Sequence, residues 1–271
     1  MKPILEMTEE EAAKIRYVLT DIDDTLTQDG KLRPDTYKML WELKEAGLAV
    51  IPLTGRPAGW CDLIARTWPV DGVVGESGAF AFWETAENGG KRTLKSLYHK
   101  TASSKDHPIL KKIQKRALAE FPGIRIAKDQ FSRLFDLSFD FAEEDPVLPL
   151  ATVEKIKEMA VSEGATVQVS SLHINIWIGS YNKASMAEYF LEQRFAWKSG
   201  SEDDSVFYVG DSPNDESMFA RFPMTCAVAN IRHYLKQIKA YPAFVSSKEY
   251  GEGFVEAARV LLDKRRAFCL L

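Results

Sequence analysis

The apolar residues of the chain fall into short runs separated by amphipathic or polar stretches. Five continuous apolar runs bounded by polar or turn residues predict buried strands, at residues 17–19, 48–51, 73–74, 206–209 and 225–228. Helical spacing of apolar side chains and turn residues at the ends predict helices over 35–46, 57–67 and 183–195. Strands that alternate with helices across short loops predict a Rossmann-like α/β core with a parallel sheet.

The middle of the chain does not follow this alternation of strands and helices. From residue 83 the sequence becomes polar, then contains basic, helix-like stretches, and it ends in an apolar strand over 172–178. A chain of 271 residues is long enough for two unequal domains. We therefore predict a core built from residues 1–82 and 181–271, with an inserted α+β domain at 83–180.

Composition narrows the range of partners. The formal net charge of −4 gives no general attraction to nucleic acid or to an anionic membrane, so a small molecule is the expected partner. Three scattered cysteines, Cys61, Cys226 and Cys269, argue against a disulfide framework or a zinc cluster. The acidic N-terminal segment and the lack of a long apolar stretch predict a cytoplasmic protein. The sequence does not indicate an oligomeric state.

The clearest chemical signal lies at residues 21–27, directly after the first core strand. Alternate residues that leave a strand face the same side, so Asp21 and Asp23 are expected to meet one ligand. Two close carboxylates repel each other unless a cation or a shared proton compensates. Mg²⁺ prefers oxygen ligands and is the natural cation here. The alternative is an acidic loop that only caps the next helix.

Two other segments offer groups that suit a phosphate. The tripeptide Thr54-Gly55-Arg56 follows a strand, and its hydroxyl, backbone N–H groups and basic side chain can hold phosphate oxygens. The same tripeptide also makes ordinary turns. Lys183 begins a helix, where a lysine is a poor partner for the helix dipole but can bind an anion.

A second acidic segment follows the strand at 206–209. Asp211 and Asp215, with Asn214 between them, provide further oxygen ligands for a metal ion, although a tight acidic turn would look the same.

These motifs, in this order, resemble the phosphatases of the haloacid dehalogenase-like superfamily. The pattern is Asp-x-Asp-x-Thr from Asp21, then Thr-Gly-Arg, Lys183 and Gly-Asp-x-x-Asn-Asp at 210–215. The position of the inserted domain resembles the type IIB cap of the Cof-like and sucrose-phosphate-phosphatase-like branch. Residues 76–79 look like that branch's Asn-Gly-Ala turn at the hinge into the cap, with Ser77 in place of the asparagine.

The resemblance implies a role for each motif residue. Asp21 would be the nucleophile, Asp23 the general acid and base, and Thr54 a ligand of the transferring phosphoryl group. Lys183 would neutralise that group and hold Asp21. Asp211 would bind Mg²⁺ together with Asp21 and the backbone carbonyl of Asp23, supported by Asn214 and Asp215.

The strand predicted near the end of the cap is the candidate for specificity. Ser171, His173 and Asn175 alternate with aliphatic residues, so they share a face that either contacts substrate or is simply solvated. The substrate-binding candidates are Thr54, Gly55, Arg56, Ser77, His173, Asn175 and Asn214.

Together these features predict a Mg²⁺-dependent phosphomonoester hydrolase that acts through an aspartyl-phosphate on a small phosphorylated sugar or related metabolite. A phosphosugar mutase on the same fold and a non-catalytic, Mg²⁺-binding regulatory module remain alternatives. A dehalogenase is disfavoured, because a halide leaving group needs no acid such as Asp23. The sequence contains no GxxxxGK[ST] motif, which leaves a P-loop enzyme without support.

Overall fold

Six parallel strands form the central sheet in a computed structural model that describes residues 1–86, 90–170 and 172–269. Their order across the sheet is β1 (Lys2–Pro3), β15 (Phe244–Val245), β14 (Met224–Ala227), β13 (Val206–Gly210), β2 (Tyr17–Thr20) and β5 (Ala49–Pro52). Because every pair is parallel, the carboxyl ends of β2, β5 and β13 meet at one edge of the sheet. The predicted α/β core is confirmed.

Alternate residues of the central strands pack into two separate cores. Val18 of β2 belongs to the core that contains residues of four helices, α1 (Glu9–Lys14), α2 (Pro34–Glu45), α3 (Ala58–Thr67) and α8 (Tyr250–Phe268). Leu19, the next residue, packs on the opposite face with α6 (Lys183–Phe195) and α7 (Glu216–Arg221). The continuous apolar runs in the sequence therefore reflect strands that are covered on both faces.

A smaller three-stranded sheet continues from the core. β6 (Val73–Gly75) lies beside the end of β5 through a parallel bridge between Leu53 and Val74. The long hairpin of β7 (Phe80–Ala86) and β8 (Arg92–Tyr98) pairs with β6. The predicted boundary at residues 82 and 83 falls within β7, and the exact division into domains stays a prediction.

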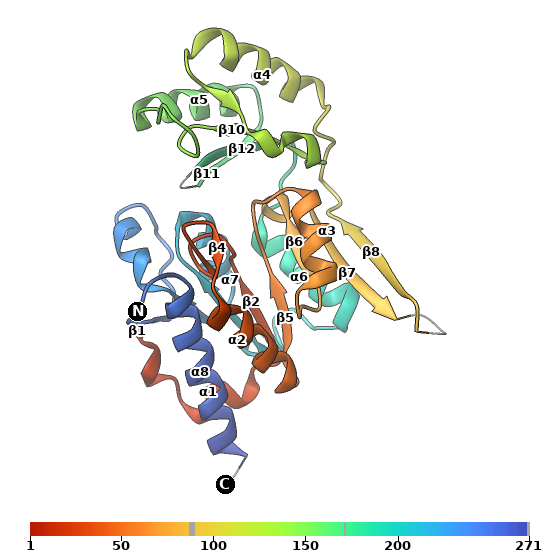
Figure 1. Cartoon of the computed structure of the whole chain (residues 1–271), viewed down its shortest axis with the longest axis vertical. Coiled ribbons are helices and arrows are strands. Elements are labelled where there is room, and N and C mark those ends of the chain that lie inside the picture. The colour runs from red at the N-terminus through yellow and green to blue at the C-terminus, as the bar shows by residue number, and fades with distance from the viewer. Residues whose placement is uncertain (87–89, 171, 270–271) are drawn as a thin grey trace.

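The inserted segment builds an antiparallel sheet of its own. Its order is β11 (Thr166–Val169), β12 (His173–Trp177), β10 (Asp136–Asp140) and β9 (Arg125–Ile126). Helices α4 (Pro108–Glu120) and α5 (Leu150–Ser162) cover one face and share a separate apolar core with it. Figure 1 shows these helices above the sheet, whose other face is turned to the α/β core. We call this unit the cap.

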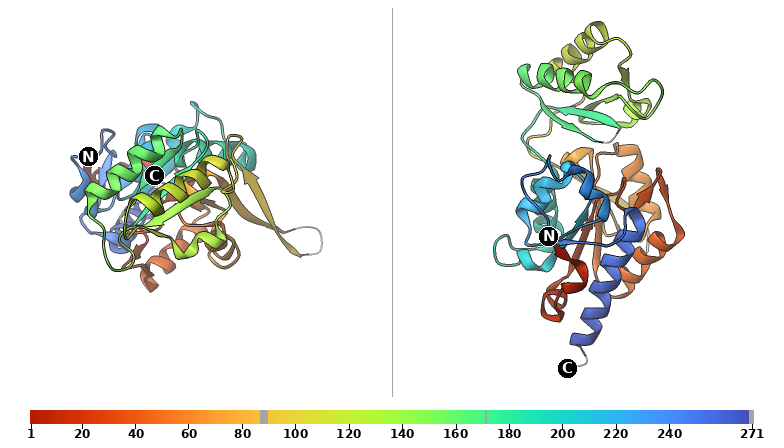
Figure 2. Two further views of the ribbon diagram at one scale, coloured as in Figure 1. Left: turned by 90° about the horizontal axis from the view of Figure 1, so that it is seen from above. Right: turned by 90° about the vertical axis from the view of Figure 1, so that its left-hand side faces the viewer.

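The remaining elements are short. They comprise the β3 (Thr27–Gln28) and β4 (Lys31–Leu32) hairpin and the 3₁₀ helices η1 (Ile4–Glu6), η2 (Glu76–Gly78), η3 (Lys128–Ser132), η4 (Asp203–Ser205), η5 (Pro213–Asp215) and η6 (Ala229–Tyr234). Both chain termini lie on the core, away from the cap (Figures 1 and 2). Among the described residues, no helix has the length and apolar character needed to cross a membrane.

Candidate active site

Four predicted site residues meet at the carboxyl edge of the central sheet. Asp21 follows β2, Asp215 ends η5 after β13, and Lys183 is the first residue of α6. The Lys183 Nζ atom lies 2.7 Å from Asp21 Oδ1, 2.7 Å from Asp215 Oδ1 and 3.0 Å from Asn214 Oδ1. Asp21, Lys183 and Asp215 are buried, so this ammonium holds two carboxylates where water does not screen them.

The carboxylate of Asp215 has all its positions occupied by protein donors. Its Oδ1 accepts from Lys183 and from the Tyr208 hydroxyl, and its Oδ2 accepts from the backbone N–H groups of Asp211 at 2.8 Å and Ser212 at 3.2 Å. These bonds fix the loop after β13 and the position of the lysine. Asp215 therefore orients other site groups in addition to lying in the acidic cluster.

Asp21, Asp211 and Asp215 form a cluster suited to a cation. Ligand oxygens from the three carboxylates all lie within 4.8 Å of one another. Asp21 Oδ2 is buried and has no hydrogen-bond partner among the described residues. Asp211 is held from both sides, by the Thr25 hydroxyl at 3.1 Å and the Asn230 amide at 3.2 Å. Buried oxygen atoms with an open position are what a hard divalent ion requires.

Burial makes these carboxylates hold protons more strongly. Burial raises the pKa of Asp21 to about 7, against the opposing effect of Lys183. Burial and the neighbouring Asp215 and Asp21 raise the pKa of Asp211 well above its usual value. Although burial lowers the pKa of Lys183, Asp21 and Asp215 raise it more, so the lysine stays an ammonium. The cluster therefore binds protons when no cation compensates its charge.

Asp23 lies in a different environment from Asp21. Its carboxylate is held by the guanidinium of Arg56, with Nη2 2.8 Å from Oδ1 and Nε 3.0 Å from Oδ2. The Arg56 guanidinium also lies over the Trp60 ring, 4.6 Å from its centroid. The side chain of Asp23 is thus outside the carboxylate cluster. The predicted contribution of its backbone carbonyl to the metal site stays a prediction.

The loop after β5 places its hydroxyl inside the protein. Thr54 is fully buried, and its Oγ1 accepts the backbone N–H of Arg56 at 3.0 Å. This bond ties the Thr54 side chain to the loop, and Thr54 itself is not among the residues that line the pocket. Gly55, Arg56 and Ser77 line the neighbouring pocket.

This pocket lies between the core and the cap. The core provides Asp21, Asp23, Lys183, Asp211 and Asn214 to its walls, among other residues, and the cap provides the predicted His173 and Asn175. Both cap side chains are 5% exposed, so they are not simply solvated. Ser171, the third residue of the predicted face, lies outside the described residues.

The cap side chains have partners within the cap. His173 Nε2 lies 2.8 Å from a carboxylate oxygen of Glu143, and the Ser138 hydroxyl donates to Asn175 Oδ1 at 2.8 Å. These contacts fix the two side chains toward the pocket.

Several pocket residues were not predicted from the sequence. On the cap side, Gln168, Ser170 and Leu172 line the pocket, and Gln168 Nε2 donates to the backbone carbonyl of Asn214 at 3.0 Å. On the core side the additions are Asp24, Ser212 and Tyr234. Asn230 was also missed, since a single polar residue on a 3₁₀ helix gives no recognisable pattern.

Comparison with known proteins places the chain in a family. Residues 15–261 match the family described as sucrose-6F-phosphate phosphohydrolase. A phosphoglycolate phosphatase of Methanothermobacter thermautotrophicus is 27% identical, covering 90% of this chain and 98% of the relative. One of Methanospirillum hungatei is 26% identical, covering 91% and 96%.

Solved structures share the fold at lower sequence identity. A Thermoplasma acidophilum protein is 22% identical with a TM-score of 0.67, covering 95% of this chain and 99% of that one. The sucrose-phosphatase of Synechocystis, solved with sucrose and phosphate, is 16% identical with a TM-score of 0.61, covering 90% and 97%. The chain belongs to the sucrose-6F-phosphate phosphohydrolase family, and it is a phosphatase of the haloacid dehalogenase-like superfamily.

Proposed function

We propose that the protein hydrolyses small phosphate monoesters through a phosphoryl group carried on Asp21, with Mg²⁺ as cofactor. The observation that carries this proposal is the position of Asp21. One of its oxygens is held by Lys183 and the other has no hydrogen-bond partner in the part of the chain that the structure describes, in a pocket that also contains Asp23. A carboxylate oriented in this way is a nucleophile with a fixed direction.

In the first step, an Asp21 oxygen forms a bond to phosphorus while the bond from phosphorus to the ester oxygen breaks. Asp23 donates a proton to the leaving alkoxide, which departs as an alcohol. Lys183 and the Thr54 hydroxyl offset the charge on the phosphoryl oxygens. In the second step, a water oxygen forms a bond to phosphorus while the bond from phosphorus to the Asp21 oxygen breaks. Asp23 takes up a proton from that water, and the products are inorganic phosphate and the free Asp21 carboxylate.

The acidic cluster supports a divalent cofactor. Asp21 and Asp211 would hold Mg²⁺, with the Asp23 carbonyl, and Asn214 and Asp215 would support the site. When bound, the ion would neutralise charge on the phosphoryl group and orient it. Without it, the buried carboxylates repel each other and the incoming phosphate.

The substrate class is a small phosphorylated sugar or a related metabolite. The curated relatives are named phosphoglycolate phosphatases, which makes a two-carbon phospho-acid a candidate as well. The pocket supports a small polar leaving group, because the cap presents Gln168, His173 and Asn175 there. A cytoplasmic location and the lack of nucleic-acid or membrane partners remain predictions from composition.

Hydrolysis of p-nitrophenyl phosphate, with and without Mg²⁺, tests the proposal. We expect turnover that requires Mg²⁺ and stops after exhaustive chelation. Ca²⁺ should inhibit, because the larger ion accepts more ligands and lets Asp21 chelate with both oxygens. A non-catalytic module would give no turnover, and a mutase would transfer phosphate to a sugar hydroxyl without releasing it. A panel of phosphate esters that includes phosphoglycolate and hexose phosphates then identifies the preferred substrate.

A further inference from the structure

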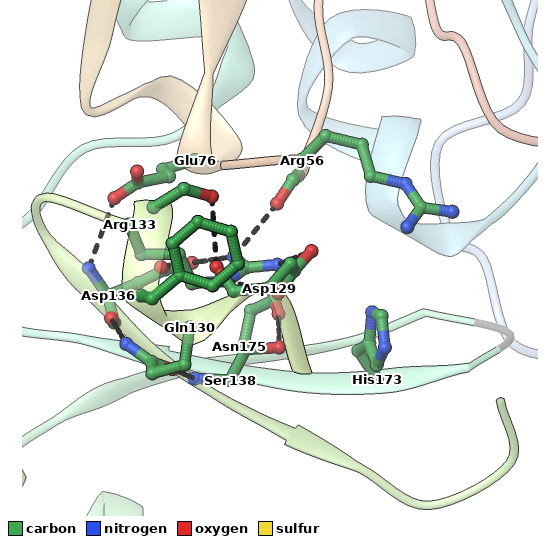
Figure 3. A network of polar contacts seen from close by, with 12 residues as sticks. Arg56, Glu76, Asp129, Gln130, Arg133, Asp136, Ser138, His173 and Asn175 are labelled. Atoms are coloured by element: carbon green, nitrogen blue, oxygen red, sulfur yellow. Dashed lines mark hydrogen bonds and ion pairs between the residues drawn. The ribbon is translucent and has the colours of Figure 1, made fainter. Parts of the chain in front are cut away.

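A group of buried charges joins the cap to residues 54–56, which we call the phosphate-binding loop after its proposed role. Arg133, from the cap, has a side chain that is 0% exposed, as is that of Asp136. The Arg133 guanidinium donates to both oxygens of Asp136, at 3.1 and 2.9 Å, and to Asp129 at 3.1 and 3.2 Å. Its Nη1 atom also reaches across to the core and donates to the backbone carbonyl of Gly55 at 3.1 Å. Figure 3 shows Arg133, Asp129 and Asp136 together on the cap side of this contact.

The carbonyl that Arg133 holds belongs to the peptide group between Gly55 and Arg56. The N–H of the same peptide donates to Thr54 Oγ1 at 3.0 Å. One rigid peptide plane therefore connects the cap arginine to the Thr54 hydroxyl, the proposed ligand of the phosphoryl group. Movement of Arg133 frees the carbonyl, and the orientation of the Thr54 hydroxyl is then no longer fixed from the cap side.

A core carboxylate makes the reciprocal contact. Glu76, in the hinge turn, is fully buried and accepts the backbone N–H groups of Leu134 at 2.9 Å, Phe135 at 2.7 Å and Asp136 at 3.2 Å. It also accepts the N–H of Ala58, at the start of α3, at 3.1 Å. Cap and core are thus linked in both directions through two buried side chains, those of Arg133 and Glu76 (Figure 3).

Two glycines allow this close approach. A Cβ atom on Gly55 would lie 2.9 Å from Asn175 Nδ2, and one on Gly59 would lie 2.8 Å from Ser132 Cβ. Both neighbours belong to the cap. Gly55 in the loop is therefore small enough for Asn175 to approach, and Gly59 in the first turn of α3 is small enough for the cap segment 128–136 to dock directly on it.

We propose that Arg133 is a positioning residue for the phosphate-binding loop, so that the phosphoryl site is complete only when the cap is docked. Arg133 does not touch the substrate. It acts through the Gly55 peptide on Thr54, and Glu76 holds the cap segment that carries it. This inference rests on the proposed function for the identity of the phosphoryl site, and it adds a dependence of that site on the cap.

The test compares Arg133→Lys with Arg125→Lys in the full chain. Lysine keeps the charge but cannot reach two carboxylates and a carbonyl at once. Arg125 is the matched control, because it also bonds a carboxylate, Asp140, and two carbonyls, those of Glu144 and Pro146, all within the cap. We expect Arg133→Lys to weaken binding of inorganic phosphate in the presence of Mg²⁺ on the order of tenfold. It should raise KM for p-nitrophenyl phosphate by a similar factor, whereas Arg125→Lys changes neither.

A purely structural role would lower the melting temperature of Arg133→Lys and leave phosphate affinity per folded molecule unchanged, and this result would overturn the proposal. Gly59→Ala is a second test of the proposal, and this substitution alters no charge. It should push segment 128–136 away and weaken phosphate binding, and Gly59→Ala/Ser132→Gly should restore it. Equal affinity of wild type and Gly59→Ala for inorganic phosphate would also overturn the proposal.

These measurements distinguish a failure of the proposed function from a failure of the role proposed for Arg133. Wild-type protein that binds phosphate without hydrolysing any ester refutes the proposed function, and the affinity comparison still decides the role of Arg133. Wild-type protein that does not bind inorganic phosphate overturns both.

Discussion

At the residue scale, the site is governed by crowded carboxylates. Asp21, Asp211 and Asp215 are buried together with one ammonium, that of Lys183. The free energy of burying this excess negative charge is unfavourable until a cation binds, and functional sites often retain such a cost. Two predictions follow from this excess of buried carboxylates over ammonium groups.

The first concerns Asp211→Asn. An amide at this position can still accept from Asn230 and donate to the Thr25 hydroxyl, and it avoids the free-energy cost of burying the acid as a carboxylate or of protonating it. We expect the metal-free variant to be more stable than wild type by about 1–2 kcal/mol, seen as a higher melting temperature. Mg²⁺ should no longer raise that temperature. Asp62→Asn, at an exposed ion pair with Arg66, is the control and should behave as wild type. A less stable metal-free Asp211→Asn would contradict this picture.

The second concerns pH and metal affinity. The pKa of Asp21 is about 7 in the metal-free protein, against an ordinary value of 3.8, so below pH 7 a proton occupies the carboxylate that the cation needs. Mg²⁺ affinity should therefore rise as the pH increases from 6 to 8, by up to about tenfold per pH unit below the pKa. Because the pKa of Asp211 is also raised, the increase of Mg²⁺ affinity with pH should continue above pH 7. Titration calorimetry at pH 6, 7 and 8 measures it, together with the protons released. Affinity that does not vary with pH would show that these carboxylates are already ionised.

Much of this site follows from the sequence, because each motif stands at the end of a strand or the start of a helix whose pattern is clear. Asp21, Lys183 and Asp215 meet for that reason. The pairing of Asp23 with Arg56 could not be predicted, since it depends on the conformations of two loops that are 33 residues apart in sequence.

At the scale of elements, two strands, β11 and β12, supply the cap residues Gln168, His173 and Asn175 that line the pocket. The alternation in β12 indicated a polar face from the sequence. The segment Thr166–Val169 carries too short a pattern to be assigned, and only the register of β11 on β12 places Gln168 opposite Asn175. A strand pairing therefore adds pocket residues that periodicity within one strand does not reveal.

The third prediction tests this surface. Replacing His173 or Asn175 with alanine removes polar groups that line the pocket and that we propose contact the leaving group, so kcat/KM for the preferred ester should fall by roughly 10- to 100-fold. Hydrolysis of p-nitrophenyl phosphate should change little, and the ranking of substrates should shift. Thr166→Ala is the control, because Thr166 is exposed on β11 and does not line the pocket. An unchanged ranking in both pocket variants would exclude these residues from substrate recognition.

At the scale of the whole molecule, the active site depends on two sheets of different kinds. The parallel core was predictable because its strands are covered on both faces and follow each other with helices between them. The internal order of the cap was not, since its antiparallel sheet pairs segments far apart in sequence, such as β10 and β12. The buried contact between Arg133 and the Gly55 carbonyl also leaves no sequence pattern, because it links a side chain to a main-chain group 78 residues away.

The central claim is that Asp21 carries the phosphoryl group while Asp23 transfers protons. General acid–base assistance is typically worth about 10²- to 10⁴-fold per step, and an aryl phosphate, with its good leaving group, depends on it less in the first step. Asp23→Asn should therefore form the phosphoenzyme and release it slowly, whereas Asp21→Asn cannot form it, because an amide is a poor nucleophile toward phosphorus.

Rapid-quench labelling with a radiolabelled aryl phosphate, followed by peptide mapping, measures this directly. The account predicts that Asp23→Asn accumulates label on Asp21 and that Asp21→Asn shows none. Label on any other residue, or label that persists in Asp21→Asn, would contradict it.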